Sequence, residues 1–568
     1  MSIEDLWPPR VPKVCGADVE LGNFVLGAPQ APPGYAARAL LNRIDGVSSK
    51  PPTAEFAACS CGECVARRAS AAVGRWPSIG GVLLAPNPDG AGGASGEIDP
   101  QDWGRRFLAE NGGCAYIDLD HLELCLPETR SAFDHVACWH AMLRIARRAL
   151  VAANRAETAG RTIQVLVNNR DGQGNSYGSH LDFLITRRAW NNIFSRRMHY
   201  LLYLAAYQVS SIVFTGQGKV GADNGRGEAS FQLSQRADFM ETLTGVQTTF
   251  NRPIVNSRDE PLCGAVALAL EDRSASGDRA DRRNARLHSI FFDSTLCHVA
   301  SLLKVGVMQI VLAMIEAERV NAGLVLDDPL EALGIWSRDP SLQTRARLAS
   351  GASVTAVELQ RRFFDEASAF AASGELDEVV PRADEILGRW DDTLRKLEAR
   401  DFASLAPQLD WVLKRSLLDR VMQQRPDLAW ESAAIRHLDH VYSSLDTGDG
   451  LYWACEEQRA VERVVSDREI ERFTAQPPDD TRAWTRAMLL RATDREAVDH
   501  VDWDWMRVGT QGRSSRTVRR FDMPHPARFG RAEAEPCLRS ADTLDDALDA
   551  LDALRGTTER GETHHEIS

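Results

Sequence analysis

Acidic and phenolic side chains occur at two-residue spacing in two short stretches, which could bring them together for chemistry. Asp18 and Glu20 alternate with apolar residues in one stretch, and Tyr116 and Asp118 do so in another, shortly before Glu123. In an extended strand, residues two apart point to the same side, so each stretch would present its oxygen atoms on one face. Carboxylates suit Mg²⁺, a small hard cation that usually keeps waters and bridges to nucleotide phosphates. The pattern favours an ATP and magnesium site built on a β-sheet.

Two histidines, His180 and His288, occur in further strand-like stretches and are candidates for the same site. Taken singly, each of these residues more commonly lies on a solvent-exposed strand face or caps a turn. Spacing alone therefore does not assign them a function.

Other familiar catalytic motifs are missing from the sequence. The stretch Gly216-Gln-Gly-Lys-Val-Gly lacks the four-residue gap of a phosphate-binding loop and the Ser or Thr that follows its Lys. Gly174-Asn-Ser-Tyr-Gly178 matches G-x-S-x-G in its letters, but a predicted strand and not a helix follows it, so it is not a nucleophile elbow. There is also no H-E-x-x-H helix. A Walker-type NTPase is therefore disfavoured, and no hydrolase of those two motif classes is indicated.

The elements that must position these residues are a mixture of strands and helices. Period-two alternation predicts strands over residues 14–25 and 116–120. Apolar residues at helical spacing predict a long helix over residues 132–156. The mixture predicts an α+β fold. Further strands are predicted over 163–167, 183–185, 212–214 and 287–292, and further helices near 298–317, 355–372 and 383–399.

Composition suggests how the chain divides into domains. Residues from about 26 to 105 lose periodicity and gather Pro, Gly, Ser and Ala, which indicates a long insertion. The chain breaks again at Gly448-Asp-Gly450 before a segment rich in Trp, Arg and Asp. We therefore expect a large domain over residues 1–450, a small C-terminal domain over 451–555 and a polar tail over 556–568.

Bulk properties exclude some function classes. With 44% hydrophobic and 26% charged residues, the 568-residue chain is an ordinary globular protein. A net charge of -14 offers no basic surface for nucleic acid. The N-terminal residues do not resemble a signal peptide, and the apolar run 305–315 is too short to span a bilayer. Eleven cysteines in such a chain indicate reduced thiols, so we expect a cytoplasmic protein that does not bind membranes.

Several stretches resemble the Pup ligase and Pup deamidase family (PafA/Dop), in the family's order and over most of the chain. Gly16-Ala-Asp-Val-Glu-Leu-Gly resembles the family's opening strand, G-x-E-x-E-[FY]-G. The segment from Asn111 to Glu128 follows N-G-x-R-x-Y-x-D and then H-P-E-Y-x-x-P-E, and residues 168–180 follow N-N-x-D-G and S-Y-G-x-H. Further matching stretches lie at 213–216, 231–238, 251–261, 286–288, 303–306, 337–342, 409–411, 450–452 and 477–482.

This resemblance implies a glutamine-synthetase-like antiparallel sheet that cradles ATP and Mg²⁺, packed with helices and capped by the small C-terminal domain. It places Asp118 at the position of the catalytic aspartate. It implies metal ligands at Asp18, Tyr116 and Glu123, with Glu20 and His288 as additional members, and nucleotide contacts at Trp503, Arg258 and Arg286.

The resemblance also implies a small Pup-like protein tag and tagged proteins as partners, in a proteasome-linked pathway. In the ligase direction, ATP phosphorylates the tag's terminal Glu, and Asp118 accepts a proton from the attacking lysine. In the hydrolase direction, Asp118 attacks the terminal amide or isopeptide, or activates a water. The insertion at 26–105 resembles the deamidase branch in length, so hydrolysis is the preferred direction.

The sequence departs from the family pattern near the site. Cys114 stands where the family has a nucleotide-contacting Arg, and His180-Leu-Asp stands for His-Glu-Asn. One residue is missing between Asp118 and Glu123, which changes strand parity unless a turn or bulge absorbs it, so Asp120 is a reserve candidate for the acid. Another insertion spans about 263–283. These departures leave open a third alternative, a catalytically degenerate nucleotide-binding adaptor.

A cysteine cluster outside the family pattern could bind zinc. Cys59, Cys61 and Cys64 supply three thiolates, and Cys15 or a histidine could supply a fourth ligand. The alternative is a reduced loop, because C-x-C-x-x-C is an incomplete site by itself.

Overall fold

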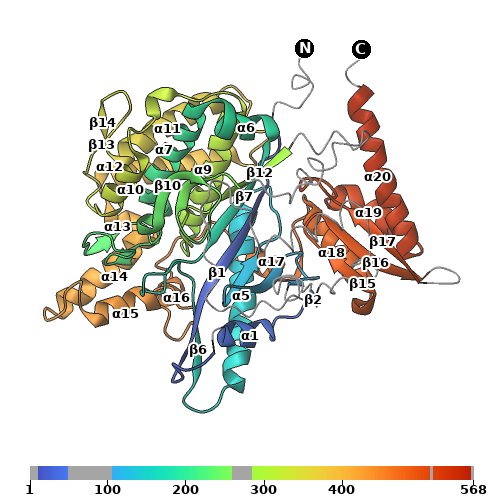
Figure 1. The fold of residues 1–568 in the computed structure, drawn as a ribbon, viewed down its shortest axis with the longest axis horizontal. Coiled ribbons are helices and arrows are strands. Elements are labelled where there is room, and N and C mark those ends of the chain that lie inside the picture. Colours follow the sequence, from blue (N-terminus) through green and yellow to red (C-terminus); the bar gives the residue numbers. More distant parts are fainter. Residues whose placement is uncertain (1–9, 33, 49–104, 259–283, 512–515, 565–568) are drawn as a thin grey trace, which may run out of the picture.

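A large body of strands and helices carries a smaller C-terminal unit at one end (Figure 1). The structure is a computed structural model that describes residues 10–32, 34–48, 105–258, 284–511 and 516–564. The predicted insertion at 263–283 and the Cys59, Cys61 and Cys64 cluster lie outside these residues, as do most of the insertion at 26–105 and the end of the tail. Residues 26–48 of the first predicted insertion include a short helix and a strand.

The centre of the large body is an eight-stranded sheet within the described residues. Its order is β12-β7-β1-β5-β4-β3-β2, and β6 pairs with the far half of β1. All of these pairings are antiparallel. The strands are β1 (Cys15–Leu26), β2 (Val47–Ser48), β3 (Arg106–Phe107), β4 (Cys114–Asp118), β5 (His121–Cys125), β6 (Thr162–Leu166), β7 (Ser179–Thr186) and β12 (Asn284–Ser289).

Alternation gives this sheet one apolar and one polar face. In β1, Ala17, Val19 and Leu21 are at most 5% exposed and join the main core, while Asp18 and Glu20 point the other way. The strands on either side follow the same rule, so the apolar face is shared by Ala115, Leu122, Leu124, Leu181, Phe183, Ile185, Ala285 and Leu287. The polar face is consequently free to carry the site.

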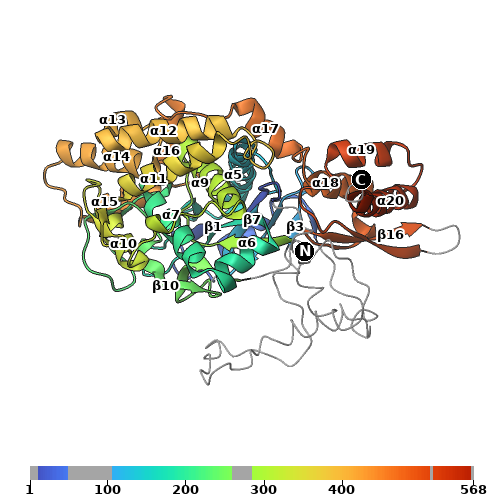
Figure 2. The ribbon, with the colours of Figure 1, turned by 90° about the horizontal axis from the view of Figure 1, so that it is seen from above.

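Helices cover the apolar face in two layers. Next to the sheet lie α1 (Tyr35–Leu41), α5 (Ala132–Ala156) and α9 (His298–Glu316), and α9 packs in turn against α7 (Met198–Thr215) and α12 (Ala383–Ala399). Figure 2 shows the helical layer extending over one side of the large body. By length and composition α9 could cross a membrane, but its apolar window is entirely buried inside the protein, so it is a core helix here.

The remaining elements of the large body surround this framework. The short strand pairs are β8 (Lys219–Val220) with β9 (Phe231–Gln232), β10 (Met240–Gly245) with β11 (Arg252–Asn256), and β13 (Ala346–Arg347) with β14 (Ser353–Val354). The other helices are α6 (Arg187–Asn191), the π-helix η2 (Asn192–Arg196), η3 (Ala237–Phe239), η5 (Ala322–Leu324), α10 (Pro329–Ser337), α11 (Ala356–Ala371), α13 (Phe402–Leu405), α14 (Asp410–Gln424), α15 (Ala433–Val441), α16 (Leu451–Glu457) and α17 (Asp467–Ala475).

Most predicted elements are confirmed, and two need correction. The long helix over 132–156 has the predicted bounds, and the helices near 298–317, 355–372 and 383–399 match α9, α11 and α12. The strand predicted over 212–214 is wrong, because these residues lie in α7. That helix is buried almost all round, so a short piece of it has no polar side to reveal its period. The strand predicted over 287–292 is β12, which starts at Asn284 and ends at Ser289.

The C-terminal unit packs around a second hydrophobic cluster, which it shares with Val47, Phe107, Cys114, Tyr116 and Cys125 of the large sheet. It contains α18 (Arg482–Ala492), η6 (Arg495–Ala497), a three-stranded sheet of β15 (Val498–Val501), β16 (Trp505–Gln511) and β17 (Arg516–Asp522), and the helices α19 (Arg531–Arg539) and α20 (Leu544–His564). Helices α16 and α17 instead pack into the main core through Tyr452, Trp453, Ile470 and Phe473. We therefore infer that the domain boundary lies near residue 481, later than the predicted residue 450.

A buried carboxylate joins the two units. Glu128 follows β5, and its oxygens accept hydrogen bonds from Arg482 (Nε, 2.8 Å) and Arg486 (Nη2, 2.5 Å) of α18. Arg486 is fully buried and also donates to the carbonyl oxygens of Gly112 (Nη2, 2.8 Å) and Trp503 (Nη1, 2.9 Å). Burial alone would raise the pKa of Glu128, but the two guanidinium groups lower it to about 2. One ionised carboxylate thus fixes the C-terminal unit to the sheet.

We predict that Arg486→Met lowers the free energy of unfolding by about 3–5 kcal/mol, because it removes one partner of a buried ion pair. Chemical denaturation checks the magnitude. Limited proteolysis should also release the C-terminal unit faster from the variant. The control is Arg425→Met, which removes an exposed pair with Asp427 and should leave the unfolding curve unchanged. Identical unfolding of Arg486→Met and wild type would contradict the role of this contact.

Candidate functional site

The polar face of the sheet forms the floor of a cavity of about 590 Å³. Its lining comes from β1, β4, β5, β7 and β12, from the segment before and after β11, and from the C-terminal unit. Thr248, Arg252 and Arg258 belong to the β11 segment, and Arg482 and Trp503 to the C-terminal unit. Residues more than 480 positions apart in the sequence, such as Asp18 and Trp503, therefore line one site.

A tight hairpin sets the register of the acidic residues. Leu119 and Asp120 form a two-residue turn between β4 and β5, with φ angles of +41° and +71°. Two positive φ values are typical of the hairpin turn that matches strand twist. The turn absorbs the missing residue, so Tyr116 stands opposite Glu123, and Glu123 opposite Glu20.

The same hairpin argues against Asp120 as the alternative candidate for the catalytic acid. Asp120 lies in the exposed turn, not on a strand, and its carboxylate lies beside Gly34. Its side chain is not among those lining the cavity, whereas Asp118 is. The prediction that residue 120 continues the strand face is wrong, because the chain already reverses at Leu119.

Three carboxylates form a first possible cation site. Glu20, Asp118 and Glu123 offer oxygen atoms that all lie within 4.8 Å of one another. Glu123 is 2% exposed, and its Oε2 is buried with no hydrogen-bond partner in the described part of the chain. Burial, and then the charges of Asp18, Glu20 and Asp118, raise the pKa of Glu123 well above its ordinary value. Such a group is poorly satisfied by the protein alone.

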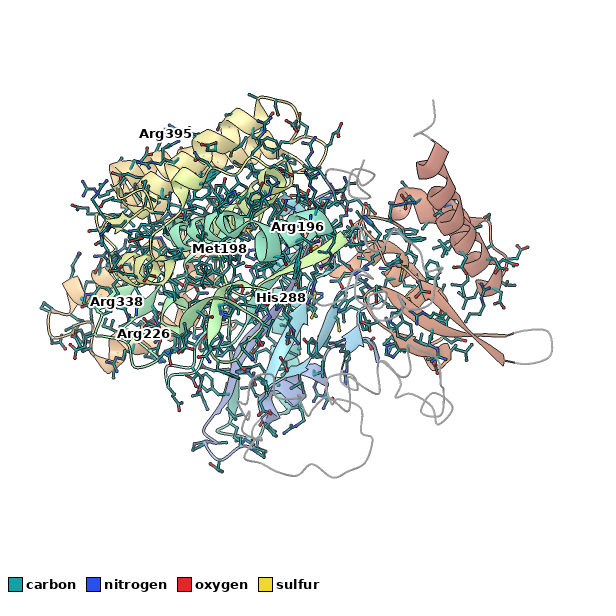
Figure 3. The ribbon with its side chains drawn as sticks, turned by 45° about the horizontal axis from the view of Figure 1, so that its top comes forward. Arg196, Met198, Arg226, His288, Arg338 and Arg395 are labelled. Carbon is teal, nitrogen blue, oxygen red and sulfur yellow. The ribbon has the colours of Figure 1, made fainter. Side chains whose placement is uncertain are left out.

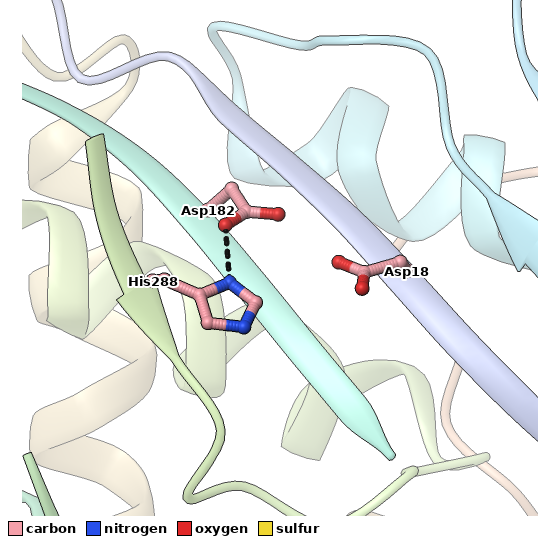
Figure 4. Close-up of side chains that lie close together, drawn as sticks. All are labelled: Asp18, Asp182 and His288. Atoms are coloured by element: carbon pink, nitrogen blue, oxygen red, sulfur yellow. Dashed lines mark hydrogen bonds and ion pairs between the residues drawn. The ribbon is translucent and has the colours of Figure 1, made fainter. Parts of the chain in front are cut away.

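A second possible cation site lies on β1, β7 and β12, and it shares β1 with the first site. Asp18, Asp182 and His288 again bring ligand atoms within 4.8 Å of one another. Figure 4 shows Asp182 and His288 on neighbouring strands, with the Nδ1 of His288 2.7 Å from the Oδ1 of Asp182, and Asp18 facing them from β1. His288 lies near the middle of the molecule in Figure 3. The predicted metal ligands therefore separate into two groups.

His180 connects the two groups. Its Nδ1 lies 2.9 Å from the Oδ2 of Asp18, and its ring lies 4.9 Å from that of His288. Burial alone would lower the pKa of His180, but Asp18 and Glu20 raise it. A Cβ atom on Gly178 would lie 2.6 Å from the Oε1 of Glu20 and 2.7 Å from the Nε2 of His180. Glycine at this position leaves these two polar groups room to face the cavity.

Tyr116 lies in the same cross-strand row as Glu20 and Glu123. The residue is 8% exposed, and burial followed by the neighbouring Glu123 raises the pKa of its phenol well above the ordinary value. The guanidinium of Arg105 lies over its ring, 5.2 Å from the centroid. Tyr116 thus stands between the carboxylates and a cationic side chain.

Cations and an aromatic ring surround the acidic floor. All three predicted nucleotide contacts, Trp503, Arg258 and Arg286, line the cavity. Arg286 pairs with Asp182 at 3.1 Å. Trp503 packs its ring against Phe107, with centroids 5.3 Å apart. The cavity therefore joins carboxylates that suit hard cations with guanidinium groups that suit anions.

Two arginines lie near position 114, where the family pattern has an arginine. Cys114 is fully buried, and burial raises the pKa of its thiol to about 12. The charges of Arg105 and Arg486 act to lower that pKa, so both guanidinium groups lie close to the thiol. Arg105 and Arg482 line the cavity. Neither was among the predicted site residues, although Arg482 ends the family-like stretch 477–482.

The structure adds Asp182 to the predicted set. It shares the polar face of β7 with His180 at the same two-residue spacing as Asp18 and Glu20, and that spacing could have identified it. Arg105 and Arg482 offer no such signal, because tertiary packing alone brings them to the cavity. Of the zinc candidates, Cys15 is fully buried in the main core and bonds to the carbonyl of Gly16, so it is not available to the cysteine cluster.

Comparisons with known proteins agree with this geometry. Residues 86–508 match the family model described as Pup-ligase protein. The chain is 34% identical to a depupylase of Acidothermus cellulolyticus over 80% of this chain and 85% of that one. It is 32% identical to a Pup--protein ligase of Kineococcus radiotolerans over 73% and 87%. The solved structure of the Pup ligase PafA in complex with ADP has the same fold, with a TM-score of 0.63, 24% identity and coverage of 81% and 91%.

We predict that Glu123→Gln stabilises the protein when no divalent cation is present, because it removes one charge from the buried cluster. The gain should appear as a higher melting temperature for the variant than for the wild type. Added Mg²⁺ should raise the melting temperature of the wild type more than that of the variant, since a cation offsets the same repulsion. Thermal unfolding with and without Mg²⁺ measures both effects.

The matched control for this prediction is Glu228→Gln, an exposed glutamate outside the cavity. It should change neither the stability without Mg²⁺ nor the response to it. A Glu123→Gln protein that is less stable than the wild type, and equally responsive to Mg²⁺, would show that the cluster does not carry unbalanced charge.

Proposed function

The chain belongs to the Pup-ligase protein family, and from this premise we propose that it hydrolyses the amide or isopeptide bond at the end of a small Pup-like tag. The observation that carries the proposal is the placement of Asp118 beside Glu20 and Glu123 on the floor of a cavity that guanidinium groups also line. In this arrangement Asp118 is separate from the guanidinium groups that would bind anions.

We propose that ATP binds between the sheet and the C-terminal unit. Trp503 offers an aromatic surface, and Arg105 and Arg482 supply positive charge beside it. Arg252, Arg258 and Arg286 supply positive charge on the β11 and β12 side. Guanidinium groups bind both phosphates and carboxylates, so this second group also suits the acidic end of a protein tag.

We propose Mg²⁺ as the cation held by the carboxylates. The donor set fits, because it consists mainly of carboxylate oxygens and includes the partnerless Oε2 of Glu123. Glu20 and Glu123 would form one site beside Asp118, and Asp18, Asp182 and His288 the other. When bound, Mg²⁺ would balance the acidic floor and polarise phosphate or carbonyl oxygens. Tyr116 would complete the first site from the neighbouring strand.

Asp118 is the proposed catalytic residue. Its carboxylate lines the cavity at the end of β4, next to a rigid turn, so its backbone position is fixed by the hairpin. Hydrolysis adds the oxygen of water to the carbonyl carbon and releases the nitrogen. Asp118 acts on that carbon as a nucleophile or activates the attacking water. Glu20 lies beside it, and burial together with the charge of Asp118 raises the pKa of Glu20.

Ligation is the second candidate, because the 32% identity to a Pup--protein ligase is close to the 34% identity to the depupylase. The cavity itself suits both directions, since both act at the same carbonyl. Incubation of the protein with ATP, Mg²⁺ and a Gln-ended tag peptide should release ammonia. A Glu-ended peptide with a lysine acceptor should give no conjugate. Conjugation without ammonia release would replace hydrolysis by ligation, and silence in both assays would favour a nucleotide-binding adaptor.

We predict that Asp118→Asn lowers ammonia release by roughly 10²–10⁴-fold, the usual loss when a positioned acid–base group is removed. ATP affinity, measured by calorimetry, should stay near that of the wild type, because the nucleotide contacts lie elsewhere in the cavity. The control is Asp120→Asn, two residues away in the exposed turn, which should keep its turnover. Loss of turnover in Asp120→Asn with normal turnover in Asp118→Asn would reverse the assignment.

A further inference from the structure

A second cavity of about 500 Å³ lies next to the first, and the proposed function does not use it. It is built on the far half of β1, which leaves β5 and β7 and pairs with β6. Its volume falls within the range of ordinary ligand sites. Its lining consists of Gly22, Asn23, Phe24, His121, Gln164, Leu166, Asp171, Gln173, Tyr177, His437, His440 and Val441.

One layer of side chains separates the two cavities. Tyr177 lines both of them. His121 lines the second cavity, and its Nδ1 lies 3.5 Å from the Oε2 of Glu20, which lines the first. His121 also stands opposite Asp118 in the strand pair. The second cavity therefore ends at His121, which lies across the strand pair from Asp118.

Packing around Tyr177 keeps this wall in place. Its hydroxyl donates to the carbonyl oxygen of Arg170 at 2.9 Å and also contacts Asn168. A Cβ atom on Gly22 would lie 2.2 Å from that hydroxyl, so glycine is needed there for the ring to occupy its position. The ring of His121 lies 4.5 Å from the ring of Tyr177. The rings of Tyr177 and His121 therefore have defined positions between the two cavities.

The two cavities differ in the cationic groups that line them. Arg105, Arg252, Arg258, Arg286 and Arg482 line the first cavity beside its carboxylates. Among the described residues that line the second, none is a lysine or arginine. Asp171 supplies a carboxylate there, and its charge acts on both His121 and Tyr177. The second cavity therefore offers an amine one carboxylate and no guanidinium or ammonium group that would repel it.

Apolar groups in the second cavity suit an aliphatic chain. Phe24 is 43% exposed on the cavity side of β1, and Leu166 and Val441 contribute further apolar surface. A lysine side chain combines four methylene groups with a terminal amine, so it would contact these apolar groups along its length and aromatic rings near its charged end.

We propose that the second cavity binds the lysine side chain of a tagged protein, and that this side chain reaches the reacting carbonyl over the edge of His121, whose side chain is 25% exposed. This inference rests on the proposed function, and it specifies where the lysine nitrogen of the isopeptide bond lies. In hydrolysis the C–N bond of the isopeptide breaks, and a C–O bond forms from water. Water supplies the oxygen of the new carboxyl group and a proton for the leaving nitrogen. The tag then lies in the first cavity, among the guanidinium groups, and the lysine side chain lies in the second cavity.

Two substrates test this assignment, because they share the tag and differ only in the leaving group. A Gln-ended tag peptide releases ammonia, and the same peptide joined through its side chain to Nα-acetyl-lysine amide releases an amine with a full side chain. Gln164→Trp fills the second cavity from β6, where Gln164 pairs with Phe24. It should lower isopeptide cleavage about tenfold or more and leave ammonia release within about twofold.

The matched control is Thr162→Trp, two residues earlier on the same face of β6 and outside the cavity lining. It should leave both reactions unchanged. Calorimetry with Nα-acetyl-lysine amide alone should show binding to the wild type and to Asp118→Asn, and weaker binding to Gln164→Trp. Parallel loss of both reactions in Gln164→Trp, or no change in either, would overturn the assignment. Wild-type protein that is silent on both substrates would instead overturn the proposed function, and the inference with it.

Discussion

Crowding of carboxylates on one face of an antiparallel sheet is the constraint on which the rest of the structure depends. Period-two alternation directs apolar side chains to the helices and forces every polar residue of the same strands to the opposite face. Asp18, Glu20, Asp118 and Glu123 meet there because the strands that carry them are neighbours. Burial then makes their mutual repulsion costly. The surrounding cations and the proposed Mg²⁺ sites are the physical response to that crowding.

The C-terminal unit completes the site instead of merely lying beside it. Glu128, three residues after β5, accepts charge-assisted hydrogen bonds from Arg482 and Arg486, and Arg486 also donates to the carbonyl oxygen of Trp503. The acidic sheet thereby acquires a cationic and aromatic wall from a distant part of the chain. The same sheet continues past Asp118 to a second cavity without arginine or lysine among its described lining residues. The two cavities thus differ in their cationic groups, and the proposed lysine site uses that difference.

The sequence allowed much of this to be predicted, because alternation and helical spacing report directly on burial. The strand faces of Asp18, Glu20, Tyr116 and Asp118 follow from spacing, and the resemblance to the family ordered them into one site. Asp182 was missed although it obeys the same spacing. Arg105 and Arg482 could not be found this way, since only tertiary packing brings them to the cavity. The prediction for residues 212–214 failed because a short piece of a fully buried helix shows no period.

Anomalous diffraction from crystals grown with Mn²⁺ and ATP tests the central claim most directly. The account predicts Mn²⁺ at the carboxylates of Glu20 and Glu123, and at the group formed by Asp18, Asp182 and His288. Nucleotide density should lie between the sheet and Trp503. Nucleotide bound with no Mn²⁺ at either carboxylate group would contradict the account, because the crowded charge would then be balanced by something other than metal.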